Sequence, residues 1–182
     1  PHPKDFREDV ASAMAETSNV AAQLHLPLQS GSNSVLAAMH RGYTGERFLE
    51  KLAMARRVVP DLSVSTDIIV GFPGETDADF EETLHVVREA RFSGAFTFQY
   101  SKRPGTPAAE MPDQVPPDVV ADRYRRLQAL IDEVAWQENK ALQGRQVDTP
   151  GGTRIGRVSD VVVNRDGDVV GFSLGQVFVD GP

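Results

Sequence analysis

Residues 62–84 read LSVSTDIIVGFPGETDADFEETL, and this stretch decides the fold class. The run from Leu62 to Val70 is rich in β-branched and apolar residues, which is typical of a strand in a buried parallel sheet. A glycine-rich turn follows it, and Thr76 and Asp79 then have the spacing of a capping box at the start of a helix. A strand, a loop and a helix in this order predict a βα unit.

Two other segments end in the same way. Residues 24–28 (LHLPL) are a short apolar run that stops at a polar loop, and residues 95–100 run into the loop SKRPGT. Polar residues at helix starts accept hydrogen bonds from free backbone N–H groups. We therefore expect parallel strands near residues 24–28, 62–70 and 95–100, with helices between them that are capped by Ser32 or Asn33, by Thr44 and by Thr76.

The two ends of the chain differ from this pattern. Near the N-terminus, Phe6, Val10 and Met14 predict one apolar face of a helix. Prolines at 112, 116 and 117 mark a linker, and a long helix is expected from Asp118 to about Ala141. Two β-branched runs then flank an Asp-Gly turn, which predicts a hairpin in a small β appendage. The expected divisions are the main α/β part at 1–111, the linker and long helix at 112–144, and the appendage at 145–182.

The composition excludes several classes of site. The 182 residues include no cysteine, so the chain holds no disulfide, thiolate zinc site or thiolate-bound iron–sulfur cluster. A net charge of −7 is unlike that of a self-sufficient nucleic-acid binder. Without HxxxH, HExxH or GxSxG patterns, we predict neither a metal site nor a serine hydrolase. No apolar run is long enough for a bilayer and the first residues lack a secretory leader's apolar core, which favours a cytoplasmic protein.

Polar or glycine-rich loops follow all three expected strands. The carboxyl ends of parallel strands meet at one edge of the sheet, where α/β proteins bind their ligands. Glycines there let a ligand approach the backbone, and the helices that follow offer free N–H groups to anionic parts of a ligand. We therefore predict a single binding site made by residues 29–32, 71–76 and 101–106.

Three long motifs resemble the methylthiotransferase branch of the radical S-adenosylmethionine (SAM) enzymes. They are HLPLQSGSNSVLAAMHRGYT at 25–44, STDIIVGFPGETDADFEETL at 65–84 and AFTFQYSKRPGTPAAEMPDQVP at 95–116. The resemblance covers roughly residues 1–147 and departs at Lys102, where the family usually has proline. It implies an α/β fold, namely part of a radical-SAM partial (βα) barrel with parallel strands.

The resemblance implies a tRNA-modifying enzyme, and FTFQYS favours the branch that adds a methylthio group to C2 of N6-isopentenyladenosine next to the anticodon. In that family one [4Fe-4S] cluster, held by CxxxCxxC, cleaves SAM to a radical, and a second [4Fe-4S] cluster supplies sulfur. Both cysteine sets precede the segment that resembles Pro1 onward, so we expect a fragment that is inactive alone. The implied partners are the tRNA anticodon stem-loop and an electron donor such as flavodoxin, and the parent is expected to be a monomer.

Site residues follow from the resemblance, position by position. It assigns cofactor contacts to Gln29, Ser30, Asp67, Gly71, Glu75, Tyr100 and Ser101, and substrate contacts to His2 and Arg103. Each has a structural alternative, such as helix capping for Glu75, core packing for Tyr100 and a solvated loop for Arg103. His25 lies within a strand and is expected to be a satisfied layer residue.

Other readings stay open. The chain also fits a fragment of a threonylcarbamoyladenosine or ribosomal-protein methylthiotransferase, or a cysteine-free, non-catalytic RNA- or protein-binding module. Residues 144–147 (GRQV) resemble the start of an RNA-binding TRAM domain, whereas residues 152–175 resemble a PRC-barrel strand pair. A truncated TRAM-like module, a PRC-like module and an assembly artefact are the three alternatives for the tail. Expressed alone, the chain is expected to associate through the exposed edge of its sheet.

Overall fold

The computed structural model describes residues 1–140, 146–148, 154–163 and 169–177, which form two compact units, residues 1–134 and 135–182. This division is one of packing, and the boundaries predicted at residues 111 and 144 stay predictions. Within the described residues, no helix has the length and apolar character needed to cross a membrane.

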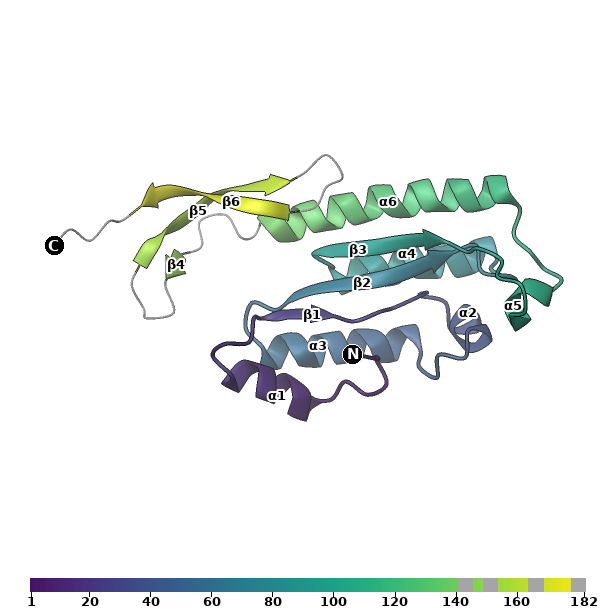
Figure 1. Cartoon of the computed structure of the whole chain (residues 1–182), viewed down its shortest axis with the longest axis horizontal. Helices are drawn as coiled ribbons and strands as arrows, with labels where there is room; N and C mark the ends of the chain where they lie inside the picture. Colours follow the sequence, from purple (N-terminus) through teal and green to yellow (C-terminus); the bar gives the residue numbers. More distant parts are fainter. Residues whose placement is uncertain (141–145, 149–153, 164–168, 178–182) are drawn as a thin grey trace. The chain divides into compact units, whose positions relative to one another are not determined.

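The first unit is built on a sheet of three parallel strands. Their order is β1 (Gln23–His25), β2 (Ser63–Val70) and β3 (Gly94–Gln99). Figure 1 shows the strands side by side, with their arrowheads at the same end. The helices are α1 (Glu8–Glu16), α2 (Asn33–Ala38), α3 (Gly45–Val58), α4 (Asp77–Ala90), α5 (Pro107–Glu110) and α6 (Pro117–Lys140). The predicted α/β class and all three predicted strands are confirmed.

The two faces of the sheet have different environments. Along β2 every second residue is buried, from Val64 to Val70, and helices α3 and α4 pack on this face in the hydrophobic core. The opposite face carries Asp67 from β2 and two exposed rings from β3. Phe96 is 62% exposed and Phe98 is 52% exposed. This second face is called the open face below, and it is defined by His25, Ser65, Asp67, Phe96 and Phe98.

The first strand is shorter than predicted. The sequence favoured residues 24–28, but β1 ends at His25, and the chain rejoins the sheet only at an isolated bridge between Gln29 and Ile68. Pro27 has no N–H to donate to a ladder. The hydroxyl of buried Thr66 replaces the ladder here, because it accepts from Leu28 N (2.9 Å) and donates to the Leu26 carbonyl (2.8 Å).

The predicted helix caps are confirmed. Ser32 rather than Asn33 caps α2, with its hydroxyl accepting from Val35 N, and Thr44 caps α3 by accepting from Arg47 N. The capping box of α4 is complete. Thr76 Oγ1 accepts from Asp79 N at 3.2 Å, and the Asp79 carboxylate accepts from Thr76 N at 2.8 Å.

One prediction for the N-terminal helix is wrong. Val10 was expected on the apolar face, yet it is 40% exposed, and Ala11 is buried instead. Phe6 is buried, but it lies before α1 begins at Glu8, so helical spacing counted from Phe6 does not identify the buried face of the helix.

The second unit contains a three-stranded antiparallel sheet. Its order is β4 (Gln146–Asp148), β5 (Arg154–Val163) and β6 (Val169–Val177). β5 and β6 pair antiparallel from Gly156 with Val177 to Val163 with Val169, which confirms the predicted hairpin and the β appendage. The Asp-Gly turn at residues 166–167 lies outside the described residues.

Candidate functional site

The three strand ends meet at one edge of the sheet, as predicted. Gln29 N donates to the Asp67 carbonyl (2.8 Å), and Ile69 N donates to the Gln29 carbonyl (2.9 Å). On the other side of β2, Tyr100 N donates to the Val70 carbonyl (2.8 Å). These bonds bring the loops that begin at Gln29, Gly71 and Ser101 next to one another.

The loop after β2 depends on the absence of a side chain at Gly71. Its φ is +76°, and a Cβ built there would lie 2.5 Å from Val120 Cγ2 on α6. A residue with a Cβ would therefore meet both a disfavoured backbone conformation and a steric clash. The Gly71 N–H donates to Glu75 Oε1 at 3.1 Å, which closes the loop on itself.

Glu75 is a buried brace of this loop. Its side chain is 1% exposed, and Oε1 lies 2.8 Å from Arg123 NH1 of α6. Burial raises the pKa of the Glu75 carboxyl above its ordinary value, while the Gly71 N–H and the Arg123 guanidinium act in the opposite direction. The Glu75 carboxylate therefore holds the loop instead of capping α4, which Thr76 and Asp79 do, and its assignment as a cofactor contact stays a prediction.

Gln29 sits in a strained position beside the partly buried Arg41. It has a φ of +69°, which is uncommon for a residue with a side chain. Its Oε1 accepts from Arg41 NH2 at 2.8 Å, which leaves the Gln29 amide NH2 as a donor. The Nε of Arg41 is buried and has no hydrogen-bond partner within the described part of the chain. Sequence reasoning missed Arg41, because an arginine at the end of a short helix resembles a solvated residue.

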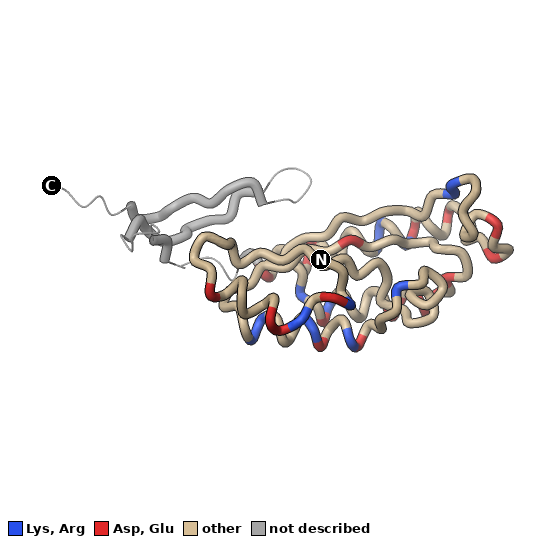
Figure 2. The backbone as a smooth tube through the Cα atoms, turned by 60° about the horizontal axis from the view of Figure 1, so that its bottom comes forward, with Lys and Arg blue, Asp and Glu red and all other residues tan. Residues whose placement is uncertain are grey.

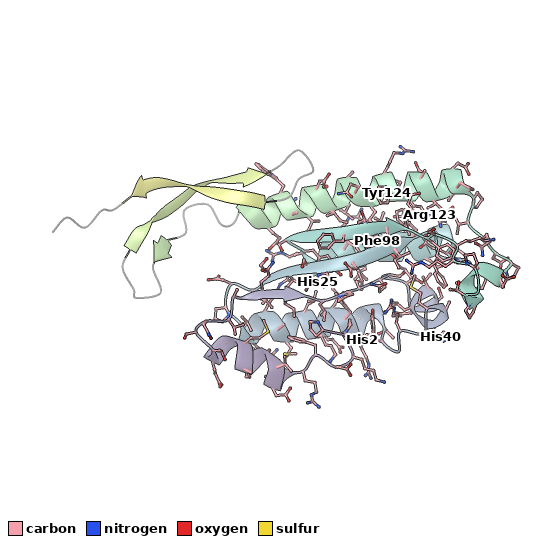
Figure 3. The ribbon with its side chains drawn as sticks, viewed as in Figure 1. His2, His25, His40, Phe98, Arg123 and Tyr124 are labelled. Atoms are coloured by element: carbon pink, nitrogen blue, oxygen red, sulfur yellow. The ribbon has the colours of Figure 1, made fainter. Side chains whose placement is uncertain are left out.

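Asp67 and His25 form a polar pair on the open face, where Figure 3 labels His25 and Phe98. His25 Nε2 lies 3.3 Å from Asp67 Oδ2, and His25 Nδ1 lies 3.1 Å from Ser65 Oγ. The two side chains are 43% and 27% exposed, and the His25 ring meets the Phe96 ring edge-on. His25 has partners for both ring nitrogens, as a satisfied layer residue would, but it lies partly exposed on the open face. Its alternation with Leu24 and Leu26, both buried, was the signal available in the sequence.

A pocket of about 310 Å³ lies between the strand ends and the start of α6. Its lining residues are Gly71, Gln99, Tyr100, Lys102, Gln114, Val115, Pro117 and Val120. Tyr100 packs edge-on against Phe72, with ring centroids 5.5 Å apart. Its hydroxyl oxygen is buried and has no partner among the described residues, so it is a free donor and acceptor at this pocket.

The remaining predicted site residues have varied environments. Ser30 is fully buried and its hydroxyl contacts Thr83 Oγ1 (3.2 Å), so it holds the loop to α4. Ser101 and Arg103 are exposed beyond the end of β3. His2 is exposed and its ring packs edge-on against Tyr43, which donates to the carbonyls of Pro27 and Leu28. Tyr43 thus places His2 near the end of β1.

Charges and metal-binding groups are dispersed over the described residues. Figure 2 shows Lys and Arg interleaved with Asp and Glu along the helices of the first unit. Within residues 1–140 and the described strands of the tail, no three His, Cys, Asp or Glu side chains cluster as a metal site would require. The arrangement offers hydrogen-bond donors and acceptors to an organic ligand.

Comparisons with known proteins agree with this architecture. Residues 2–87 match the model of the Radical SAM superfamily. The chain is 65% identical over 148 residues to the tRNA-2-methylthio-N(6)-dimethylallyladenosine synthase of Acidothermus cellulolyticus, covering 81% of this chain and 30% of that relative. It is 55% identical to the Salinispora arenicola protein of the same name, covering 97% of this chain and 36% of that relative. The chain therefore spans about a third of the length of the curated relatives it matches.

A solved structure has a similar fold. Coproporphyrinogen III oxidase of Escherichia coli, described as a radical SAM enzyme, superposes with a TM-score of 0.62 over 83% of this chain and 38% of that chain. At 19% identity this likeness speaks for the fold alone. The match to the Salinispora protein covers 97% of this chain, and the three alternatives for the tail stay predictions.

Proposed function

The chain belongs to the radical-SAM superfamily, and on that premise we propose that it forms part of the SAM pocket of a tRNA methylthiotransferase. The proposed reaction adds a methylthio group to C2 of N6-isopentenyladenosine next to the anticodon. Relatives that are 55% to 65% identical have names that state this kind of product. The observation that carries the proposal is the meeting of three loops at one sheet edge. The loops that begin at Gln29 and Gly71 lie within residues 2–87, which match the superfamily model.

The cofactors of the proposed enzyme are SAM and two [4Fe-4S] clusters, which when bound supply the radical, the sulfur and the methyl group. Because this chain has no cysteine, we propose that the cluster ligands belong to other parts of the enzyme. What this chain contributes is the binding and orientation of SAM and of the nucleotide. No residue of the described ranges is assigned a role in covalent chemistry.

The polar groups near β1 and β2 suit the ribose and amino-acid parts of SAM. The Asp67 carboxylate is an acceptor that faces the open side, and the Gln29 amide NH2 is a donor, so the two complement ribose hydroxyls. The Nε of Arg41, which has no partner among the described residues, suits a carboxylate, which guanidinium groups bind with directed hydrogen bonds. We add Arg41 to the proposed cofactor contacts for this reason.

The loops after β2 and β3 suit the base of SAM and the nucleic acid. Gly71 lines the pocket together with Val120, and Tyr100 and Ser101 follow it at the next strand end. Ser30 and Glu75 hold these loops in place, Ser30 by its hydrogen bond with Thr83 and Glu75 by its ion pair with Arg123. Arg103 and His2 are exposed near the strand ends, where we propose that they contact the tRNA.

The partners follow from the proposed reaction. The substrate is the anticodon stem-loop of tRNA, which places the enzyme in the cytoplasm. An electron donor of the flavodoxin class and a monomeric enzyme complete the proposal. The mixed charges of the helices in Figure 2 support contact through a few loop residues rather than through a broad basic face.

The test uses the complete enzyme that contains this chain, reconstituted with clusters under anaerobic conditions. SAM affinity is measured by equilibrium dialysis for wild type, Asp67→Asn and Arg41→Met, with Asp5→Asn as an exposed control outside the sheet. We expect the first two variants to weaken SAM binding by about tenfold or more, as the loss of a charged hydrogen bond does. Equal affinity in all four proteins would refute the pocket assignment.

Activity distinguishes the alternatives. The enzyme is given tRNA with isopentenyladenosine or with threonylcarbamoyladenosine, and the modified nucleosides are separated after digestion. The proposal expects methylthio product only on the isopentenyl substrate. Product on the other tRNA would correct the substrate, and tRNA binding without any product or SAM binding would favour a non-catalytic binding module.

A further inference from the structure

One guanidinium of α6 binds the segment that joins the β2 loop to α4. Arg123 NH1 donates to Glu75 Oε1 (2.8 Å) and to the Glu75 carbonyl (3.0 Å), and NH2 donates to Asp77 Oδ1 (2.7 Å). The side chains of Arg123 and Glu75 are 5% and 1% exposed, so the two bonds to Glu75 are shielded from water, whereas Asp77 is 93% exposed. Figure 3 shows Arg123 reaching from α6 toward this end of the sheet.

Glu75 transmits this contact to the backbone of Gly71. The same Oε1 that binds Arg123 also accepts from Gly71 N at 3.1 Å. A carboxylate with 1% of its side chain exposed is costly without a partner charge, so its position depends on Arg123. Arg123, Glu75 and the Gly71 N–H therefore form one connected hydrogen-bond chain.

A second contact of α6 meets the same glycine. Val120 lies one turn before Arg123, on the same side of the helix, and its methyl groups occupy the space where a Gly71 Cβ would be. The helix therefore restrains the loop twice, by packing at Gly71 and by charge at Glu75. Neither residue of α6 belongs to the motifs that resemble the family.

We propose that Arg123 is a positioning residue of the cofactor site, acting through Glu75 to hold Gly71 in its left-handed conformation. This inference rests on the function proposed above, because it takes the β2 loop as a wall of the SAM pocket. Arg123 itself touches no ligand, since its guanidinium is buried behind the loop. Loss of Arg123 leaves the Glu75 carboxylate without its partner charge, so either the carboxyl takes up a proton or the loop moves to bring it to water, and both changes weaken its hold on the Gly71 N–H.

The experiment uses the complete reconstituted enzyme with Arg123→Met, Arg123→Lys and Arg126→Met. Arg126 is the matched control, because it lies on the same helix, also sits over the Phe80 ring (4.9 Å, against 5.7 Å for Arg123) and pairs with exposed Glu81 instead of the loop. Hydrogen–deuterium exchange reports on the peptide that contains residues 71–76, and equilibrium dialysis gives the dissociation constant for SAM.

We expect Arg123→Met to speed amide exchange at residues 71–76 and to raise the SAM dissociation constant about tenfold, the effect typical of losing a group that orients a ligand-binding residue. Arg123→Lys keeps the charge but not the fork of donors, so it is expected to restore part of the affinity. Arg126→Met is expected to match wild type in both measurements.

Three results overturn the inference. The first is wild-type exchange and affinity in Arg123→Met, and the second is faster exchange spread evenly over α3, α4 and the sheet, which marks a general loss of stability. If Arg123→Met does not fold, the double variant Arg123→Met with Glu75→Gln is used instead, because it removes the unpaired charge. Wild-type SAM affinity in that double variant is the third result. Absence of SAM binding in wild type would instead refute the proposed function, while the exchange data still report on the loop.

Discussion

Gly71→Ala measures how tightly α6 restrains the β2 loop. At a φ of +76°, alanine adopts a left-handed conformation that costs about 1–2 kcal/mol. Its Cβ would also lie 2.5 Å and 2.9 Å from the two methyl groups of Val120, and such overpacking adds about 1–3 kcal/mol. We therefore expect Gly71→Ala to lower the free energy of unfolding by about 2–5 kcal/mol.

Two further variants separate the backbone cost from the clash. Gly74 has a φ of +84° and no atom within 4 Å of the place where a Cβ would lie, so Gly74→Ala should cost only the backbone term of about 1–2 kcal/mol. Val120→Ala removes two buried methyl groups and should cost about 1–3 kcal/mol alone. Combined with Gly71→Ala, Val120→Ala removes the two methyl groups closest to the new Cβ at position 71. The Cβ at position 120 remains 3.2 Å from it, so the clash is only partly relieved.

The assay is equilibrium unfolding in urea of wild type, both single variants at the Gly71–Val120 contact, their combination and Gly74→Ala. The double-mutant cycle should show a favourable coupling of about 1–2 kcal/mol between Gly71→Ala and Val120→Ala. Strict additivity, or a Gly74→Ala effect as large as that of Gly71→Ala, would show that α6 does not restrain the loop by packing.

Three other changes test the local structure around the site. Burial raises the pKa of Asp79, but hydrogen bonds from Ser32, Ser34 and Thr76 outweigh it and bring the pKa to about 2. Asp79→Asn should therefore lower the free energy of unfolding, measured in urea, by about 1–2 kcal/mol at neutral pH. As pH falls from 3.8 to about 2, wild type should lose this extra stability, whereas the variant should show no such loss. Burial raises the pKa of Tyr43 to about 12 despite nearby Arg41, so wild type, unlike Tyr43→Phe, should lose stability as pH rises from 10.0 toward that value. Tyr43→Phe should also cost about 1 kcal/mol at neutral pH, because two carbonyls lose their donor. Phe96→Ser removes an exposed ring from the open face, and sedimentation of the isolated chain should show less self-association than wild type.

Local features were predictable because their causes are local. The caps at Thr44 and Thr76 depend on side chains and N–H groups within three residues, and the alternation along β2 depends on a period of two. The predicted convergence of three strand ends followed from the geometry of parallel sheets, and the backbone bonds at Gln29 and Tyr100 confirm it.

The errors and omissions have causes that are distant in sequence. Val10 is the exception, because its exposure follows from the local start of α1 at Glu8. The break after His25 depends on Thr66, a residue 40 positions from Leu26. The exposed setting of His25 depends on what the neighbouring strands and loops leave uncovered. The buried Nε of Arg41 has no partner within the described residues because of the groups that folding places around it.

The order of strands and helices, the helix starts and the family resemblance were determined by the sequence alone, because each depends on residues near one another in the chain. Only the tertiary structure decided that Glu75 supports the loop from within and that Arg123 is its partner. These two residues lie 48 positions apart, and their ion pair exists because folding removes both from water at the same place. Burial of a charge is a property of the folded neighbourhood, which no local pattern in the chain specifies.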